Sequence, residues 1–429
     1  MVSEGGTGVG RRERDVDVLV VGAGPAGLTV AEHLAAADCG TVEVLEREPQ
    51  AGGAPRFCHH GGFGTPWTSG PRFAARRLRA ATDAGAVVRT SVTVTDLPAP
   101  RTVDVTGPDG LERITARAVV LATGARERPR AARLVPGTRP AGIHTTGELQ
   151  QAVHLYGRYI GRRAVVVGAE PVAYAALETL HHAGVAVVAQ LTELDRPQVP
   201  PLRAADARLR RTVPLLTRTM LTEVLGRGRL TGVRVRHADG RTAQLPCDTL
   251  VFTGDFVPEA ELARSGGVCL DRATRGPLVD TEFRTDVPRV FAVGNVLHAV
   301  ETAATAAAEG HAAAVAVRRL LAHENREGRA AAEPAGPRLV VAPPLRWITP
   351  GRLPCDARAD DSLRFLVRAA EPLSVRPTLT VTQDGRTLHS ERLRGPVRTG
   401  NSLELQGHWV RNVNADGGPV HITTGTGGR

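Results

Sequence analysis

Two glycine-rich loops of nearly the same form each follow a short apolar run. The first reads GAGPAG and places Gly22, Gly24 and Gly27 in the spacing G-x-G-x-x-G. The three positions permit a tight turn, close approach of a diphosphate to the backbone, and helix–strand packing. N–H groups at the start of the following helix bind phosphate. Glu46 lies where a carboxylate accepts hydrogen bonds from ribose. This loop predicts an adenine-dinucleotide site.

The second loop reads GAEPVA and has Glu170 at the position that should be bare backbone. Two like charges about 4 Å apart repel by about 4 kcal/mol at an effective dielectric of about 20. Where an acid would bind the ribose of NAD, the chain has Gln190 or Leu191. The second loop is therefore expected to keep its fold and to have lost or changed nicotinamide binding; intact NAD(P)H binding is the alternative.

The elements that must position these loops alternate between strand and helix. Apolar strands are expected over 15–21, 41–48, 116–125 and 289–295, with a second strand–helix–strand unit from residue 162. A long Ala-rich helix is expected over 302–323, and short alternating runs indicate strands after residue 354.

The predicted fold class is α/β, with two Rossmann-like dinucleotide-binding domains, one inserted in the other, and a small C-terminal all-β domain. The predicted boundaries are a disordered tail over 1–14, the first dinucleotide-binding domain over 15–157 and 276–325, the inserted domain over 158–275, a Pro-rich linker over 326–354, and the β domain over 355–429.

Composition excludes several classes of function. The 429 residues carry a formal charge of +10 but include no lysine, which excludes Schiff-base chemistry. No basic stretch is interleaved with stacking aromatic residues, so nucleic-acid binding is not expected. The five cysteines form no Cys-x-x-Cys or zinc spacing, which favours a reducing, cytoplasmic location and predicts no metal site. No apolar run is long enough to predict a membrane span.

Three further motifs carry a resemblance to a known family. They are the Gly-Gly pair at 52–53, VVLATGARERP over 119–129, and TDVPRVFAVGN over 285–295. Together with the first loop they resemble the pyridine nucleotide–disulfide oxidoreductase superfamily, over roughly residues 15–321. The resemblance implies FAD in the first domain. The family usually has Asp after the final glycine, where it binds the ribityl chain; this chain has Asn295, which carries no charge.

The resemblance also implies which residues hold the cofactor. They are Gly22, Gly24, Pro25, Ala26, Gly27, Glu46, Arg47, Gly53, Ala122, Thr123, Gly124, Gly294 and Asn295. In the family, the helix after the last motif directs its N-terminus at the flavin, and residues 298–302 stand at that end here.

The loop over 52–67 passes beside the flavin ring in the family and contains the candidate catalytic residues Cys58, His59 and His60. A single cysteine excludes a dithiol relay. A single redox-active thiolate needs a lowered thiol pKa, which the adjacent histidines and Arg56 would supply. A neutral imidazole could instead accept a substrate proton. The alternative is that Cys58 is a packed thiol and the histidines merely line a loop.

Within the superfamily, the sequence resembles the dinucleotide-binding subunits of heteromeric amine dehydrogenases such as opine oxidase and hydrogen cyanide synthase. Those subunits have similar GG-x-P-R loops; many carry a cysteine-rich [2Fe–2S] segment, which this chain lacks. The resemblance implies an FAD-dependent oxidoreductase that transfers hydride or electron pairs between its flavin and a small substrate of the amine or amino-acid type, or a partner subunit. The alternatives are an NAD(P)H-dependent flavin reductase and a flavin-bound scaffold subunit.

Overall fold

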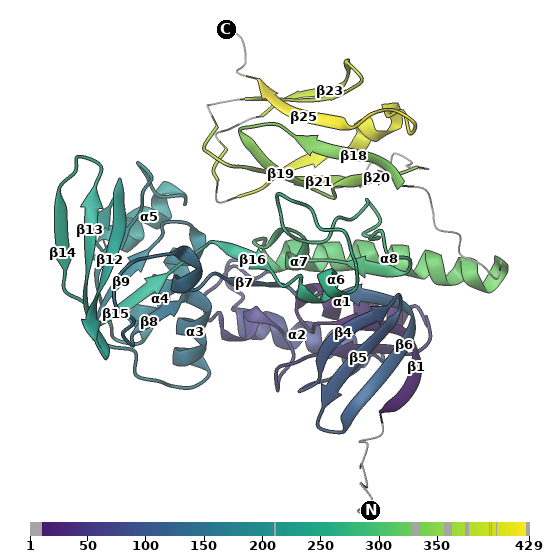
Figure 1. Ribbon diagram of the computed structural model, residues 1–429, viewed down its shortest axis with the longest axis horizontal. Coiled ribbons are helices and arrows are strands. Elements are labelled where there is room, and N and C mark those ends of the chain that lie inside the picture. The colour runs from purple at the N-terminus through teal and green to yellow at the C-terminus, as the bar shows by residue number, and fades with distance from the viewer. Residues whose placement is uncertain are drawn as a thin grey trace, which may run out of the picture.

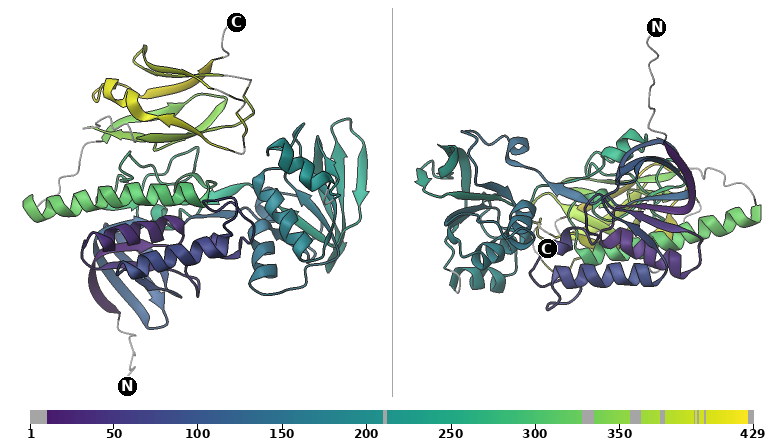
Figure 2. Two further views of the ribbon diagram at one scale, coloured as in Figure 1. Left: turned by 180° about the vertical axis from the view of Figure 1, so that it is seen from behind. Right: turned by 90° about the horizontal axis from the view of Figure 1, so that it is seen from below.

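The computed structural model describes residues 11–209, 212–327, 335–355, 363–373, 377–393, 395, 397–399 and 401–425. These residues form three units (Figure 1). The first unit lies at the bottom of that view, the second at the left, and the third above helix α8 (Ala303–Glu327). The view from behind in Figure 2 shows α8 between the first and third units.

The first unit is built on a seven-stranded sheet in the order β3-β2-β1-β6-β5-β4, with β17 also paired to β6. Its strands are β1 (Arg12–Val21), β2 (Val42–Leu45), β3 (Val87–Arg89), β4 (Thr93–Ala99), β5 (Thr102–Gly107), β6 (Gly110–Leu121) and β17 (Val290–Ala292). Its helical segments are α1 (Pro25–Ala36), η1 (Ala54–Phe57), α2 (Gly70–Asp83), α6 (Glu261–Ser265), α7 (Asn295–His298) and α8. β1, β2, β3, β6 and β17 are parallel, and their continuous apolar runs are buried because helices cover the sheet.

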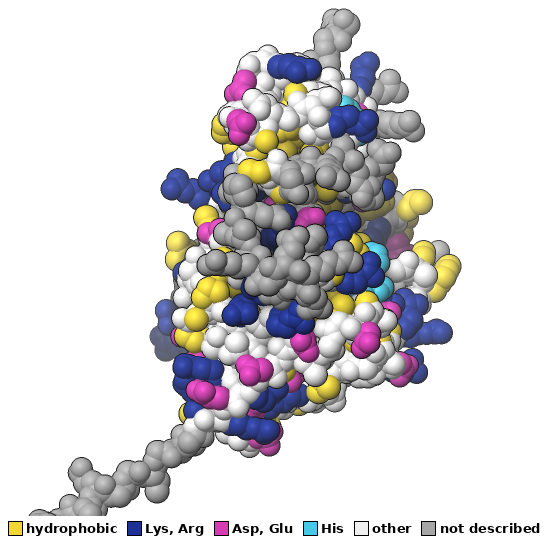
Figure 3. All heavy atoms as spheres, turned by 90° about the vertical axis from the view of Figure 1, so that its right-hand side faces the viewer, with side chains coloured by type: hydrophobic (Ala, Val, Ile, Leu, Met, Phe, Trp, Pro, Cys, Tyr) yellow, Lys and Arg dark blue, Asp and Glu magenta, His cyan; other side chains and the backbone are white. Residues whose placement is uncertain are grey.

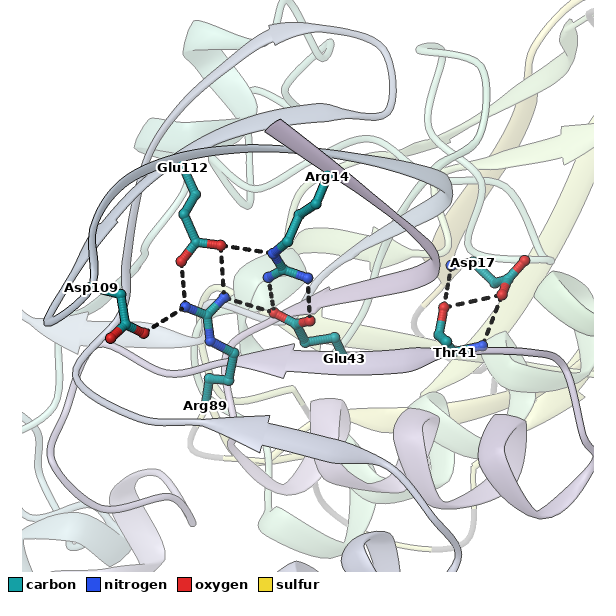
Figure 4. Close-up of polar contacts among 7 residues, drawn as sticks. All are labelled: Arg14, Asp17, Thr41, Glu43, Arg89, Asp109 and Glu112. Carbon is teal, nitrogen blue, oxygen red and sulfur yellow. Dashed lines mark hydrogen bonds and ion pairs between the residues drawn. The ribbon is translucent and has the colours of Figure 1, made fainter. Parts of the chain in front are cut away.

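Four charged side chains pair at the end of this sheet where β1 begins (Figure 4). Arg14 donates to Glu43 and Glu112, and Arg89 on β3 pairs with the same two buried carboxylates. Hydrogen bonds from Arg89, together with those from Arg14, lower the pKa of Glu112 to about 2. The pairing explains why β1 begins at Arg12, which corrects the predicted tail over 1–14. Residues 1–10 of that tail lie outside the described residues.

The second unit contains a parallel sheet in the order β11-β10-β9-β15-β8 and an antiparallel sheet β12-β13-β14. Its strands are β8 (Ile143–Thr145), β9 (Arg163–Val167), β10 (Ala186–Leu191), β11 (Leu215–Leu216), β12 (Thr219–Arg227), β13 (Arg229–His237), β14 (Thr242–Leu245) and β15 (Thr249–Phe252). Its helical segments are η2 (Arg130–Arg133), α3 (Thr146–His154), α4 (Pro171–His182) and α5 (Pro201–Leu209).

The boundaries of the second unit differ from the predicted 158 and 275. β8 already pairs with β15, and Leu149 of α3 is buried in the core of the second unit. After the second unit the chain returns to the first unit before residue 275, because Ala263 of α6 is buried in the core of the first unit. The crossing is the antiparallel pair β7 (Ala125–Glu127) and β16 (Phe256–Pro258), which has no linker-like composition to mark it.

The third unit is a sandwich of two sheets, in the orders β20-β18-β25-β22-β23 and β19-β21-β24. Its elements are β18 (Ala335–Val341), β19 (Leu345–Thr349), β20 (Arg352–Pro354), β21 (Arg364–Ala369), β22 (Thr378–Gln383), β23 (Arg386–Arg392), β24 (Leu403–Gln406), η3 (Gly407–Asn412) and β25 (Val420–Gly425). Apolar side chains from both sheets form its core.

The predicted linker over 326–354 is wrong where the chain is described. α8 extends to Glu327, and residues 335–354 form three strands of the third unit. Pro343, Pro344 and Pro350 lie between these strands, Pro337 lies within β18 and Pro354 ends β20, so a Pro-rich composition concealed a β structure. Residues 328–334 lie outside the described residues.

The surface carries mixed charge. On the face shown in Figure 3, arginine side chains are scattered among acidic and apolar ones rather than gathered in one basic patch. Among the described residues, none of the helices combines the length and the apolar character needed to cross a bilayer.

Candidate functional site

A cavity of about 1800 Å³ is lined by residues of all three units. It lies beyond the carboxyl ends of β1, β2 and β6, where open α/β sheets bind their ligands. Cavities for single drug-sized ligands typically measure about 300–1,000 Å³. The cavity therefore has room for a dinucleotide and a second molecule.

The first glycine loop fits a diphosphate. Gly22 has a φ of 106°, and a Cβ there would lie 2.4 Å from the carbonyl oxygen of Ala122. A Cβ on Gly27 would lie 2.0 Å from the carbonyl oxygen of Gly22, which explains the close packing of α1 on β1. At Gly24, by contrast, a Cβ would meet nothing within 4 Å and would occupy the cavity. The bare backbone at Gly24 leaves that space to a ligand.

Glu46 follows β2 and presents a buried carboxylate to the cavity. Its Oε2 accepts from the backbone N–H of Ala23 at 3.0 Å, and its Oε1 accepts from that of Glu48 at 2.9 Å. Each carboxylate oxygen keeps a further lone pair, which fits a ribose hydroxyl. The neighbouring Arg47 is exposed and lies 3.7 Å from Glu259.

Asn295 holds the turn between α7 and α8. Its Oδ1 accepts from the backbone N–H of Glu301 at 2.9 Å, and its Nδ2 donates to the carbonyl oxygen of Glu301 at 3.2 Å. An amide has a second lone pair and a second N–H, so one acceptor and one donor remain for a ligand.

Most residues predicted to hold the cofactor come together at the cavity. Those that line it are Gly22, Gly24, Pro25, Ala26, Glu46, Arg47, Gly53, Ala122, Thr123, Gly124 and Asn295. Gly27 and Gly294 lie behind this wall, where a Cβ would come within 3 Å of a neighbouring residue.

The three candidate catalytic residues occupy different surroundings. Cys58 is partly buried and donates to Gln150 Oε1 at 3.3 Å; burial raises the pKa of its thiol to about 12, the opposite of what a thiolate nucleophile requires. His59 is exposed, stacks on His154 at 4.0 Å and does not line the cavity. His60 lines the cavity, with Nδ1 2.8 Å from the carbonyl oxygen of Gly61.

Glu127 lines the cavity at the end of β7 and was not among the residues predicted from the sequence. Its Oε2 accepts from the backbone N–H of Gly147 at the start of α3, at 2.7 Å. Its Oε1 is buried and has no hydrogen-bond partner among the described residues. Burial raises the pKa of Glu127 to about 7. The signal was an acid three residues after Gly124, inside a motif already assigned to the cofactor.

The side chain of Glu170 fills the second glycine loop. The carboxyl group of Glu170 accepts from the hydroxyl of Thr253 and interacts with the backbone N–H groups of Ala169 and Glu170. A Cβ added to Gly168 would lie 2.7 Å from Oε2 of Glu170, so this oxygen occupies the space beside the glycine. Gln190, at the position of the missing acid, donates to the carbonyl oxygen of Gly168 at 3.0 Å. Donors that would face a diphosphate are thus turned to an internal carboxyl group.

Burial raises the pKa of Glu170 above its ordinary value, because desolvation disfavours the charged carboxylate. The side chain also fills the loop sterically, since a Cβ at Gly168 or Gly254 would lie within 3 Å of its oxygens. No group of three or more His, Cys, Asp or Glu side chains in the described part of the chain is arranged to hold a metal ion.

Fold and cavity together define an oxidoreductase with two dinucleotide-binding domains and an appended β domain. The family model for pyridine nucleotide-disulphide oxidoreductases matches residues 16–310. The chain belongs to this family and is an FAD-dependent oxidoreductase, which confirms the predicted fold class and the superfamily resemblance. The third unit lies outside the matched residues.

Curated relatives extend the comparison. Ferredoxin–NADP reductase of Ignicoccus hospitalis is 28% identical over 312 residues, covering 69% of this chain and 95% of that protein. An opine oxidase subunit of Agrobacterium tumefaciens is 26% identical over 316 residues, covering 65% of this chain and 61% of that relative. Thioredoxin reductase of T. acidophilum shares the fold, with a TM-score of 0.61 and 23% identity over 73% of this chain and 99% of that one.

Proposed function

We propose that the protein oxidises a small substrate of the amine or amino-acid type at FAD, or passes electron pairs between the flavin and a partner subunit, without binding NAD(P)H in the second unit. The contrast between the two loops carries this proposal: a Cβ at Gly24 would meet nothing within 4 Å, whereas the Glu170 side chain occupies the second loop. The likeness to one of the subunits of opine oxidase supports the amine-type substrate and the partner subunit. The cytoplasmic location remains a prediction.

The residues that would hold FAD are those of the first loop, Glu46 and the second motif around Asn295. When bound, FAD supplies a two-electron acceptor, and the protein supplies binding, orientation and electrostatics. The backbone N–H groups that open α1 face the diphosphate position, and the Glu46 carboxylate faces the ribose position.

Glu127 and His60 are the groups we assign to the substrate's proton. A protonated amine must lose a proton before its nitrogen lone pair is available. A carboxylate whose pKa lies near the working pH accepts that proton efficiently. The pKa of Glu127 is raised to about 7, and its Oε1 has no hydrogen-bond partner among the described residues, while His60 lines the same cavity.

The decisive experiment is an absorbance spectrum of the purified protein followed by anaerobic titration. We expect a flavin spectrum that NADH and NADPH leave oxidised and that some member of a panel of amines and amino acids bleaches. Rapid bleaching by either nicotinamide nucleotide would overturn the proposal that the second unit does not bind NAD(P)H. A colourless protein that cannot be reconstituted with flavin would overturn the proposal that the protein acts through FAD.

A reductase that uses NAD(P)H is the second candidate. The observation in its favour is that the match covers nearly the full length of a ferredoxin–NADP reductase. It requires Glu170 to swing away from Thr253 when nucleotide binds. Stopped-flow mixing with NADPH separates the two candidates. Only the reductase should show loss of the oxidised-flavin absorbance at a rate that increases with NADPH concentration.

A further inference from the structure

The third unit contributes part of the wall of the cavity. β19 and β21 lie on the side of the sandwich nearest α7 and α8 (Figure 1), and Arg346, Trp347 and Arg368 of these strands line the cavity. Arg368 fastens this wall to the first unit, because it donates to the carbonyl oxygen of Val300 at 2.8 Å and to Glu301 at 2.5 Å. The wall is therefore fixed on the turn between α7 and α8, beside the cofactor motif.

A β-bulge in β19 brings Arg346 to the cavity. The next two residues point to opposite faces of the strand: Ile348 is buried in the core of the sandwich, whereas Trp347 stacks on the His298 ring, with centroids 5.8 Å apart. Regular alternation would place Arg346 on the face of Ile348, inside that core. The register of β19 against β21 shifts between Leu345 and Trp347, however, so that an extra residue is inserted there. Bulges re-aim side chains in this way, and Arg346 is exposed at the cavity instead of buried.

The guanidinium of Arg346 has no carboxylate partner. The arginines of the cavity wall that form an ion pair with a glutamate are Arg47, Arg56, Arg126, Arg203 and Arg368. The side chains of Arg346 and Arg275 also line the cavity, but neither makes a hydrogen bond or ion pair with any residue in the part of the chain that the structure describes.

Arg346 also acts on a second cation. Burial lowers the pKa of Arg368, and the like charge of Arg346 lowers it further. Glu301 compensates the charge of Arg368, whereas the charge of Arg346 is left uncompensated. Like charges that repel each other are both stabilised when an anion binds close to them. The charge of this wall therefore favours an anionic ligand.

We propose that Arg346 binds the carboxylate of the substrate, so that the protein acts on amino acids rather than on simple amines. The inference rests on the proposed function, because it concerns the molecule that the flavin oxidises. A guanidinium binds a carboxylate through two parallel hydrogen bonds, which fix the orientation of the ligand as well as its affinity. The β domain, which lies outside the family match, thus supplies a specificity-determining residue.

Three substitutions test the role of this guanidinium. Arg346→Met keeps most of the side-chain length and removes the charge, and Arg346→Lys keeps the charge but loses the planar fork. Arg386→Met is the matched control, because Arg386 is an exposed arginine on β23 of the same unit and does not line the cavity.

The first measurement is a calorimetric titration of the flavin-loaded protein with benzoate and with benzamide, two probes of similar shape of which only benzoate is charged. We expect wild type and Arg386→Met to bind benzoate at least about tenfold more tightly than benzamide. Arg346→Met should bring the two affinities within about twofold of each other, and Arg346→Lys should give an intermediate ratio.

The second measurement uses the anaerobic bleaching of the flavin. Each amino acid of the panel is compared with the amine that lacks its carboxylate. Arg346→Met should weaken the apparent affinity for the amino acid about tenfold and leave that for the amine unchanged. The affinity of the variant for FAD should equal that of wild type, because the diphosphate of FAD is the other anion that a guanidinium could bind.

Four outcomes would overturn the inference: equal binding of benzoate and benzamide by wild type, a preference that Arg346→Met leaves unaltered, a loss of FAD affinity in this variant, or tighter binding of inorganic phosphate than of benzoate. Bleaching of the wild-type flavin by simple amines but by no amino acid would also overturn it, while supporting the proposed function. A wild-type flavin that neither amines nor amino acids reduce would overturn the proposed function itself. The two failures are thus distinguishable before any variant is made.

Discussion

At the scale of single residues, the proposal that the second unit does not bind NAD(P)H depends on Glu170, whose carboxyl group occupies the second glycine loop. Glu170→Gly removes the carboxyl group that fills the loop and returns the backbone N–H groups to the cavity. We expect affinity for NADH or NADPH to rise at least tenfold, about 1.4 kcal/mol, in equilibrium dialysis. Glu178→Gln, at a partly exposed glutamate on the same helix, is the control and should bind no better than wild type. Unchanged binding by Glu170→Gly would show that the side chain is not the obstacle.

Glu127 makes a separate prediction about stability. Its pKa rises from 4.5 to about 7 on folding, so the folded state holds the proton more tightly. The contribution of Glu127 to the free energy of unfolding is fully present below pH 4.5. It is lost as the pH rises to and through about 7, where the carboxyl group ionises in the folded protein. Glu127→Gln avoids this loss and should gain about 1–3 kcal/mol relative to wild type across that window, levelling off above it.

Urea unfolding at pH 5, 6, 7 and 8 measures this difference. Glu148→Gln is the matched control on the neighbouring helix, because its carboxyl group is exposed and glutamine preserves its capping role. A difference between wild type and Glu127→Gln that stays constant with pH would contradict the raised pKa.

Residue types in this chain revealed the cofactor loop but not every group around it. Gly24 and Glu46 could be placed from spacing alone, because the local strand–loop–helix path fixes their positions. The burial and raised thiol pKa of Cys58 could only be left as an alternative, since its thiol donates to Gln150, a residue 92 positions away.

At the scale of elements, the paired charges at the start of β1 stabilise the first sheet. Arg89→Met leaves Glu43 and Glu112 with one cation instead of two. We expect a loss of about 3 kcal/mol at pH 7, because breaking a buried ion pair leaves a charge uncompensated. The loss should shrink as the pH falls from 4.5 towards 2, where Glu112 becomes protonated in the folded protein.

Thermal unfolding followed by circular dichroism at pH 7 and pH 3 tests this prediction. Arg113→Met is the control, because Arg113 pairs with Asp104 near the surface and should matter little. An equal loss at both pH values would indicate a packing effect of the Arg89 stem rather than its charge.

Element boundaries show why some of the fold could not be predicted. The parallel strands were evident as continuous apolar runs, and α8 as a long alanine-rich segment. The strands β18 to β20 were hidden because prolines lie both between and within them. The start of the second unit was hidden because β8 has only three residues and pairs with a strand more than 100 positions later.

At the scale of the whole molecule, the cavity is lined by residues of all three units. The third unit binds the first through Arg368 and also reaches the second, where Thr399 donates to Gln198 at 3.1 Å. Sequence could not reveal this meeting, since it depends on how separately folded cores are placed. The side chains that a ligand in the cavity would meet therefore come from all three units rather than from one nucleotide-binding domain alone.

The position of Trp347 has a practical consequence. The chain has three tryptophans: Trp67 is almost fully exposed, Trp409 is enclosed in the β sandwich, and Trp347 alone lines the cavity. Flavins absorb where indole emits, so the ultraviolet-excited emission of Trp347 should dim most as the cavity fills. Intrinsic tryptophan fluorescence should therefore report flavin binding without an added label or turnover. The Trp347→Phe substitution should remove most of this quenching.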